Sequence, residues 1–503
     1  MLLPDNELLM PVLIVTSHPD DWPFEIPGVD KVDAWTYLTS PEVSDSAGSR
    51  STRVFNLCRS YRYQSFGYYV SLLAEARGHK PLPGVITLQD LKTRSVSRLI
   101  PDEIDELIQQ NLASLTSDEF TFSVYFGRNF AKRHERLALH LFNLFPVPLM
   151  KYEFSKREGR WQIRKIAAIS GAEVPEGHRE FVAESATRYF SGRASSLKSP
   201  RRTRFDMAIL ENPEEKDNAP SDSVALNKFV KAAREQGVYA ELITRDDSGR
   251  LLEFDSLFIR ETTAINHHTY RFARRAASEG LVVIDDPVSI CRCTNKVFLA
   301  EMLTRHKVDI PLSIVVHREN ASQIGERLGF PCVLKKPDSS FSLGVVKVKS
   351  DEELKAHLED FFGESDLLVA QEYLPTTFDW RIGILDRKPL YACRYFMAPG
   401  HWQIIRQEEK GRGRYGKVET LPVELAPPKA VKAALKAANL IGDGLYGVDV
   451  KESNGRFVVI EVNDNPNINS GYEDAVLKDE LYRRVIEVFV RRMEQKRARY
   501  DAD

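Results

Sequence analysis

The stretch VVIEVNDNP (residues 458–466) decides how this chain is read. Three β-branched residues precede Glu461, Asn463 follows two positions later, and the run ends in an Asn-Pro turn. Side chains alternate along a strand, so Glu461 and Asn463 leave the same face, roughly 7 Å apart along the chain. Two oxygen ligands at that spacing can converge on one hard cation. A strand end that simply reaches solvent explains the same residues. Other segments of the sequence are therefore needed to choose between these two interpretations.

The residues before this stretch form the other half of an expected hairpin, LYGVDVKESNGRFVVIEVN (residues 445–463). A two-residue Asn-Gly turn would place Asp449 and Glu461 on opposite faces. A three-residue Ser-Asn-Gly loop, with Gly455 left-handed, would place both on one face as diagonal neighbours. We therefore expect the longer loop. Asp449, Glu461 and Asn463 would then form an oxygen cluster of the kind that Mg²⁺ prefers, together with substrate phosphates.

A cationic segment lies upstream, in FPCVLKKPDSSFSLGVVKV (residues 330–348), which reads as strand, loop and strand. Lys335 at the end of the first strand can balance phosphate charge, and small loop residues let backbone N–H groups approach phosphate oxygens. A surface hairpin is the alternative. The small residues of the loop are Ser339, Ser340, Ser342 and Gly344.

Two further strands add polar groups. LLVAQEYLP (residues 367–375) is an apolar strand that ends in Gln371 and Glu372, before a Pro-containing hinge that can offer backbone groups to an adenine edge. FDWRIGIL (residues 378–385) carries Asp379 and Arg381, which share a strand face and equally fit a plain ion pair.

Length and composition bound the class of protein. A chain of 503 residues is expected to form about three domains. The 70 basic and 72 acidic side chains give a net charge of −2, so bulk charge favours neither nucleic acid nor a membrane surface. No apolar run is long enough to span a bilayer. Five sparse cysteines predict reduced thiols and a cytoplasmic protein.

The order of elements predicts three parts. The first opens with a strand at Val12 to Thr16 and reads as an α/β domain of unclear type. Residues 191–204 are rich in small and basic side chains and predict a solvated linker, with contact to an anionic partner as the alternative. Residues 205–285 alternate strands with helices that end in Gly, as βαβ units on a parallel sheet do. The alternation is less regular from residue 296 onward.

These segments, in this order, resemble the ATP-grasp superfamily and specifically its RimK-like amino-acid ligases. The resemblance covers about residues 205 to 490, and the whole chain resembles the subgroup with an added RimK-like ATP-grasp N-terminal domain. It implies an α/β protein in which two α+β subdomains clasp ATP, preceded by a parallel-sheet pre-ATP-grasp domain and an extra N-terminal α/β domain. The implied divisions are an accessory domain (1–195), a pre-ATP-grasp domain (203–295) and an ATP-grasp domain (296–492).

The resemblance also implies roles for individual residues. Those expected to bind ATP are Lys296, Lys335, Ser339, Ser340, Ser342, Gly344, Gln371, Glu372, Tyr373 and Asp379. Those expected to bind Mg²⁺, with Mn²⁺ as an allowed substitute, are Asp449, Glu461 and Asn463. Arg381 and Arg394 are expected to be catalytic, and Arg260 and Asn467 to bind substrate.

Arg260 is chosen because it ends the strand SLFIR (residues 256–260), and a guanidinium binds a carboxylate in a bidentate manner. An ion pair with Glu261 or a surface acid is the alternative. Relatives usually carry an Arg-Ser-Asn stretch after Gly400, whereas this chain has Gln403, Ile404 and Ile405. The residues considered as replacements on that side of the site are Arg394, Arg406, Arg412 and Arg414.

The reaction implied by the resemblance joins a carboxylate to an amine through an acyl phosphate, at the expense of ATP. The carboxylate and the amine belong to an amino acid, a peptide or a protein tail, and the family is compatible with a homo-oligomer. Two alternatives stay open at this point. One is a nucleotide-binding regulatory or scaffold protein, and the other is an ATP-grasp kinase that releases a phosphorylated product.

Overall fold

The computed structural model describes residues 12–26, 28–40, 52–91, 102–191, 203–215, 218–338, 344–407 and 413–502. The chain divides into two compact units. The first is Met1–Asp206 with Asp246–Asp255, and the second is Met207–Arg245 with Ser256–Asp503. The expected division into three domains stays a prediction. The two units differ from the expected boundaries at one segment. Asp246–Asp255 belongs to the first unit, although it was expected within the pre-ATP-grasp domain.

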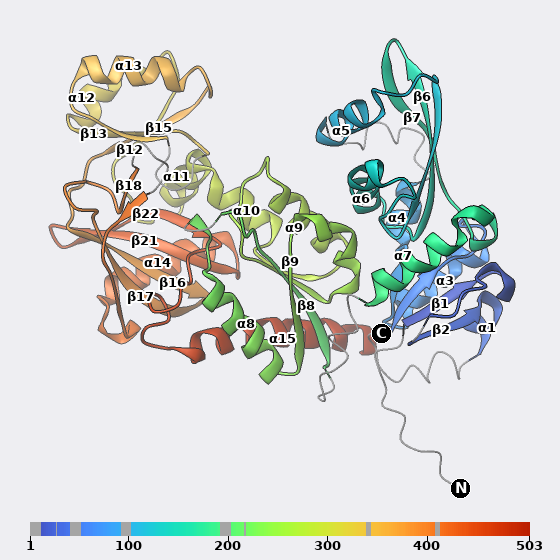
Figure 1. Ribbon diagram of the computed structural model, residues 1–503. Coiled ribbons are helices and arrows are strands. Elements are labelled where there is room, and N and C mark those ends of the chain that lie inside the picture. Colours follow the sequence, from blue (N-terminus) through green and yellow to red (C-terminus); the bar gives the residue numbers. More distant parts are fainter. Residues whose placement is uncertain are drawn as a thin grey trace, which may run out of the picture. The chain divides into compact units, whose positions relative to one another are not determined.

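The first unit begins with a parallel sheet (Figure 1). The expected first strand, Val12–Thr16, is central in this sheet, and its apolar residues are largely buried because helices cover the sheet. In spatial order the strands are β2 (Val29–Asp33), β1 (Val12–Thr16), β3 (Arg53–Asn56) and β4 (Lys80–Leu82). The accompanying helices are α1 (Ala34–Thr39), α3 (Phe66–Ala76) and α4 (Val85–Asp90).

An antiparallel sheet completes the first unit. Its strands are β5 (Glu119–Tyr125), β6 (Leu149–Arg157) and β7 (Arg160–Ala168), in that spatial order. Its helices are α5 (Asp102–Leu112), α6 (Glu135–Leu144) and α7 (Arg179–Ser191). Phe122 and Tyr152 face one another in a core shared with Trp22 of the parallel-sheet part, so both sheets belong to one folding unit.

The second unit opens with the expected parallel arrangement. Strand β8 (Phe205–Leu210) is buried along its whole length, which fits a sheet covered on both faces. The sheet also contains β9 (Val238–Ile243), β10 (Ser256–Ile259) and β11 (Val282–Ile284), in the spatial order β11-β10-β8-β9. Its helices are α8 (Ser223–Glu235), α9 (His268–Ser278) and α10 (Pro287–Thr294).

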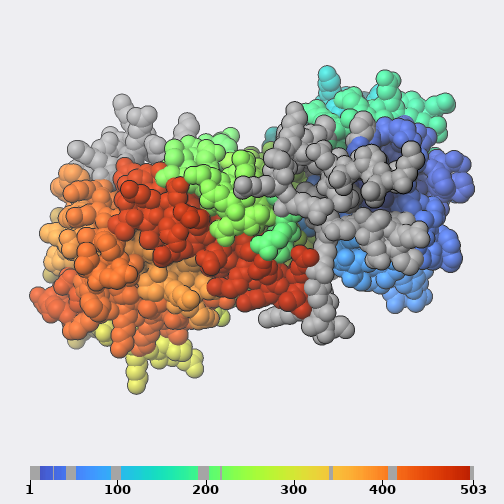
Figure 2. Space-filling model, turned by 90° about the horizontal axis from the view of Figure 1, so that it is seen from below, coloured from blue at the N-terminus to red at the C-terminus, as the bar shows by residue number. Residues whose placement is uncertain are grey.

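The last helix of the chain, α15 (Asp479–Ala502), returns to this part of the second unit. It lies along α8, which Figure 2 shows as red beside green. Leu481, Val485 and Phe489 form an apolar stripe that is fully buried, and Tyr482 contacts Phe229 of α8 with ring centroids 4.7 Å apart. Among the described residues no helix, this one included, is apolar enough over a sufficient length to cross a membrane.

Two antiparallel sheets form the rest of the second unit. The first has the order β12-β15-β13-β14 and the second β20-β17-β16-β21-β22. The strands of the first are β12 (Ser313–Val316), β13 (Cys332–Lys335), β14 (Val345–Val348) and β15 (Leu368–Glu372). Those of the second are β16 (Phe378–Leu385), β17 (Lys388–Phe396), β20 (Val418–Leu421), β21 (Leu445–Ser453) and β22 (Arg456–Asp464).

Helices cover these sheets, so each is one layer of an α+β subdomain as expected (Figure 1). The helices are α11 (Lys296–Arg305), α12 (Ile324–Leu328), α13 (Asp351–Phe361) and α14 (Pro428–Ile441). Strands β18 (Ile405–Gln407) and β19 (Gly413–Tyr415) pair with one another in a separate two-stranded ribbon.

The β21–β22 hairpin differs from the expectation in its turn. Ser453 pairs with Arg456, so the loop is the two-residue Asn454-Gly455 turn, and both residues have positive φ as that turn requires. The three-residue loop was therefore wrong. Asp449 nevertheless pairs directly with Glu461, because a β-bulge shifts the register between Asp449 and Val450. The extra residue is Ile460, and it places the two carboxylates on one face.

Candidate active site

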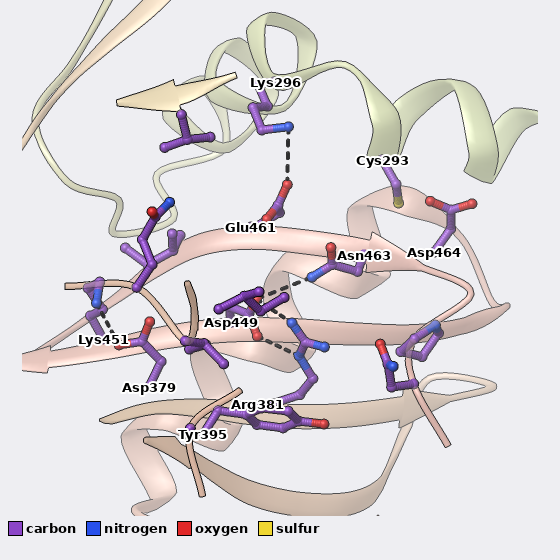
Figure 3. Close-up of a pocket in the computed structure, with 18 of the residues that line it drawn as sticks. Cys293, Lys296, Asp379, Arg381, Tyr395, Asp449, Lys451, Glu461, Asn463 and Asp464 are labelled. Atoms are coloured by element: carbon purple, nitrogen blue, oxygen red, sulfur yellow. Dashed lines mark hydrogen bonds and ion pairs between the residues drawn. The ribbon is translucent and has the colours of Figure 1, made fainter. Parts of the chain in front are cut away.

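A cavity of about 740 Å³ lies in the second unit, and strands of both antiparallel sheets line it (Figure 3). Most of the expected site residues line it. They are Lys296, Lys335, Gln371, Glu372, Tyr373, Asp379, Arg381, Asp449, Glu461, Asn463 and Asn467. The register explains the convergence, because Asp449 of β21 stands opposite Glu461 of β22 and Arg381 of β16.

Oxygen atoms gather on the β21–β22 face. The Asp449 carboxylate accepts two hydrogen bonds of 2.6 Å from Nε and Nη2 of Arg381. Asn463 Nδ2 donates to Asp449 Oδ2 at 3.3 Å. The carbonyl oxygen of the Asn463 side chain is therefore the atom of that amide that can coordinate a cation. Burial raises the pKa of the Asp449 carboxyl, and the Arg381 guanidinium opposes that rise. Two carboxylates and one amide oxygen on one strand face fit a hard divalent cation such as Mg²⁺.

Lysines surround these oxygens. Lys296 Nζ lies 3.4 Å from Glu461 Oε1. Lys335 is buried, and its desolvation lowers the pKa of its ammonium to about 8, although Glu461 partly opposes the change. Lys451 donates to Asp379 Oδ1 and to Thr376 Oγ1, each at 2.6 Å. A cavity with this many cations is suited to a polyanion, because the low dielectric strengthens each attraction.

Two aromatic side chains also line the cavity. Tyr373 and Trp402 both line it, with ring centroids 5.9 Å apart, and Lys347 lies over both rings. Glu372 has a structural task there, since its backbone N–H donates to the Leu312 carbonyl and its carboxylate accepts from the Leu312 N–H at 2.8 Å. The cavity therefore combines two aromatic side chains with charged groups suited to phosphates.

Two expected arginines do not face the cavity. Arg394 pairs with Trp380 across β16 and β17, and it therefore lies on the face opposite Arg381. Its guanidinium lies over the rings of Phe378 and Trp380, and 3.8 Å from Glu419. The catalytic role expected for Arg394 is wrong in this structure, because the side chain points to the other side of the sheet.

Arg260 is only 1% exposed, and its guanidinium makes four hydrogen bonds with neighbouring residues. It donates to Ser221 Oγ at 3.0 Å, to Asn465 Oδ1 at 2.6 Å, and to the carbonyls of Pro220 and Pro466 at 2.6 and 2.8 Å. The expected bidentate hold on a substrate carboxylate is therefore not what the structure shows. Arg260 instead fixes the Asn465-Pro466 turn that follows β22.

Several expected residues lie beyond what can be described. Ser339, Ser340 and Ser342 fall outside the described ranges, as does Arg412, and the side chains of Arg406 and Arg414 on the β18–β19 ribbon do too. Gly344 is described and has a φ of 70°, a left-handed conformation that suits glycine. Its carbonyl accepts from the Lys336 N–H at 2.8 Å, which closes the base of the β13–β14 hairpin.

Other lining residues were not expected from the sequence. Lys451 is two positions after Asp449, a spacing that signals the same strand face. Tyr395 lies under the Arg381 guanidinium, and its hydroxyl donates to Glu473. Burial raises the pKa of Asp464 to about 7, although a 2.7 Å hydrogen bond from Thr263 Oγ1 opposes the rise. Glu473 and Asp464 also line the cavity. Tertiary contacts bring them there, and no local sequence pattern predicts this.

An oxygen cluster, flanking lysines and two aromatic side chains, held between two α+β subdomains, define an ATP-grasp protein. Residues 293–479 match the RimK-like ATP-grasp domain, and residues 34–185 match the RimK-like ATPgrasp N-terminal domain. The chain therefore carries both a RimK-like ATP-grasp domain and a RimK-like ATP-grasp N-terminal domain, as expected from the sequence.

Curated relatives have matching names. The chain is similar to the "Probable alpha-L-glutamate ligase" of Alcanivorax borkumensis, with 27% identity over 236 residues, covering 46% of this chain and 75% of the relative. It is also similar to the "Probable alpha-L-glutamate ligase 1" of Shewanella denitrificans, with 28% identity over 239 residues, 46% of this chain and 76% of the relative.

Solved structures are more distant. The ATP complex of the D-alanine–D-alanine ligase from Bacillus anthracis has 19% identity and a TM-score of 0.44, covering 58% of this chain and 99% of that one. The RimK domain ATP-grasp protein from Sphaerobacter thermophilus has 16% identity and a TM-score of 0.43, covering 56% of this chain and 98% of that one.

Proposed function

We propose that this chain is an ATP-dependent ligase that joins the carboxylate of one amino acid or peptide to the amine of another. The observation that carries the proposal is that Asp449, Glu461 and Asn463 lie on one face of the β21–β22 hairpin. Lys296 and Lys335 line the same cavity. A carboxylate and ATP repel one another, so a catalyst of this reaction must first neutralise negative charge. The cavity is built for that task.

The carboxylate–carboxylate–amide set fits Mg²⁺, with Mn²⁺ as a substitute, and the bound ion would neutralise and align phosphate oxygens. The chain's own residues complete the site. Lys335 and Lys296 would contact the phosphates, while Tyr373 and Trp402 would contact the base. Arg381, fixed by Asp449 and by the Tyr395 ring, presents a positive charge where the reacting carboxylate would lie.

The chemistry balances in two displacements. A carboxylate oxygen attacks the γ-phosphorus of ATP, and ADP leaves with the electrons of the broken P–O bond. The amine then attacks the acyl carbon, phosphate leaves, and the amine nitrogen loses a proton to give the amide. Both steps need alignment and charge stabilisation rather than a side-chain nucleophile.

The names of the relatives make L-glutamate the first amine to test on this chain. All five cysteines are free, which supports a reducing, cytoplasmic compartment. The homo-oligomer stays a prediction, which size-exclusion chromatography with light scattering would check.

The test measures ADP release from Mg²⁺-ATP with pools of carboxylates and amines, with mass spectrometry of the product. Glu461→Gln removes a proposed metal ligand, and Glu487→Gln on the exposed side of α15 is the matched control. Release that needs both substrates, yields an amide and disappears only in Glu461→Gln would support the ligase. A phosphorylated product without an amine would indicate a kinase, and ATP binding without turnover would indicate a regulatory protein.

A further inference from the structure

A second cluster of ligand-type side chains lies between β10 and α9, apart from the oxygen cluster on β21 and β22. It consists of Glu261, His267 and His268, whose ligand atoms all lie within 4.8 Å of one another. Its composition differs from that of the first cluster. Two imidazoles and one carboxylate suit a borderline cation, whereas an oxygen-only set suits Mg²⁺.

Glu261 is the informative member. Its side chain is only 1% exposed, yet neither carboxylate oxygen makes a hydrogen bond within the described residues. Oε1 lies 2.8 Å from His268 Nε2, but this contact lacks hydrogen-bond geometry. A buried carboxylate without a donor is costly, so the arrangement calls for a cation between these atoms.

The two histidines are held in place around that carboxylate. Their ring centroids are 3.9 Å apart, and His267 Nδ1 lies 3.0 Å from Thr269 Oγ1. A metal-binding imidazole is normally oriented by such a contact through one ring nitrogen. Glu215 adds negative charge nearby, and both its oxygens accept from the Thr262 N–H at 3.2 Å.

We propose that Glu261, His267 and His268 form a binding site for Zn²⁺ that is separate from the ATP-binding cavity. Three protein ligands and one open position are typical of zinc sites that keep a water or an exogenous ligand. Tetrahedral ligands about 2 Å from zinc stand roughly 3.3 Å apart, so the Glu261–His268 contact needs to widen only slightly. If a protonated His268 were the only partner of Glu261, it would pair with one oxygen of the Glu261 carboxylate and leave the other oxygen without a partner.

The proposed ion would border the ATP-binding cavity. The Glu261 carbonyl accepts a 2.5 Å hydrogen bond from Asn465 Nδ2, in the turn that Arg260 also holds. Thr262 and Thr263 line the cavity, and Thr263 donates to Asp464. Zinc bound by Glu261 would therefore stabilise the segment that positions the end of β22. It is an addition to the proposed ligase function and does not depend on it.

The test uses the full chain, stripped with a chelator and kept in excess Mg²⁺. Titration with Co²⁺ should produce the intense visible absorption of a four-coordinate site with nitrogen ligands, and Zn²⁺ should displace it. His267→Gln and His268→Gln should weaken binding more than about 100-fold, because even an outer partner of a ligand contributes 10- to 100-fold. His357→Gln on α13 and Glu461→Gln should bind Co²⁺ as the wild type does.

Thermal melting gives a second readout. Zn²⁺ should raise the melting temperature of the wild type and of Glu461→Gln, but not that of His268→Gln. The proposal is overturned if the wild type shows no such Co²⁺ absorption, if Mg²⁺ displaces it, or if the two histidine variants bind as tightly as the wild type. His267 is partly exposed at the start of α9, so its variant tests the site even if the others fold poorly.

Discussion

Replacing Lys335 with Met should stabilise the protein in the absence of nucleotide and weaken ATP binding. Burial lowers the pKa of Lys335 from 10.5 to about 8. That difference corresponds to about 3 kcal/mol by which the charged lysine opposes folding at neutral pH. A methionine of similar length removes this cost, and in a unit of this size the melting temperature should rise by roughly 5 to 10 °C.

The pH dependence of stability follows from the same difference. Below pH 8 the lysine is charged in both states and its full cost is present. As the pH rises from 8 to 10.5, the folded state loses its proton first, so the unfolded state binds more protons and the free energy of unfolding rises. This rise should be absent in Lys335→Met, as measured by melting curves without nucleotide.

Binding should change in the opposite direction. Loss of charge-assisted hydrogen bonds to phosphate costs about 1.5 to 3 kcal/mol, so calorimetry should show ATP binding weakened about 10- to 150-fold. Lys451→Met is the matched control for the effect on stability. It removes the hydrogen-bond partner of Asp379, so it should destabilise the protein by about 3 kcal/mol. If both variants destabilise equally, or Lys335→Met binds ATP normally, the reasoning about Lys335 is refuted.

Three more outcomes are expected. Glu461→Gln should abolish ADP release while its circular dichroism spectrum stays that of the wild type. Arg260→Lys should destabilise the protein by about 3 kcal/mol in urea melts, because a lysine cannot serve four acceptors, and an effect confined to KM for the carboxylate substrate would contradict this. Arg394→Ala should keep kcat within about twofold of the wild type, because the side chain lies on the far face of the sheet, and a loss of tenfold or more would restore its catalytic role.

The sequence predicts the alternation of elements well, because strand periodicity is a local signal. The shared face of Asp449 and Glu461 was expected from a three-residue loop, whereas the loop has two residues and the bulge at Ile460 produces that face. Prediction from the sequence fails where a β-bulge changes which face a residue occupies. Arg394 shows this, because a regular β16–β17 hairpin with its two-residue turn would pair it with Asp379 and point it into the cavity. A register shift between Gly383 and Ile384 pairs it with Trp380 instead.

Arg260 shows a different limit. A strand-end arginine beside a cleft predicts a carboxylate ligand, but its partners are a serine, an asparagine and two backbone carbonyls that come from distant segments. Such contacts depend on the tertiary fold and leave no periodic signal. Asp464 and Glu473 escaped notice for the same reason.

The bulge at Ile460 also changes what a short piece of chain can present to a ligand. In a regular strand every second residue turns toward the core, so neighbours cannot both reach a cavity. Here Ile460 and Glu461 both line it. One dipeptide thus supplies an apolar surface and an anionic group side by side, and the size of residue 460 should limit how closely a nucleotide can approach the proposed metal ligands Asp449 and Glu461.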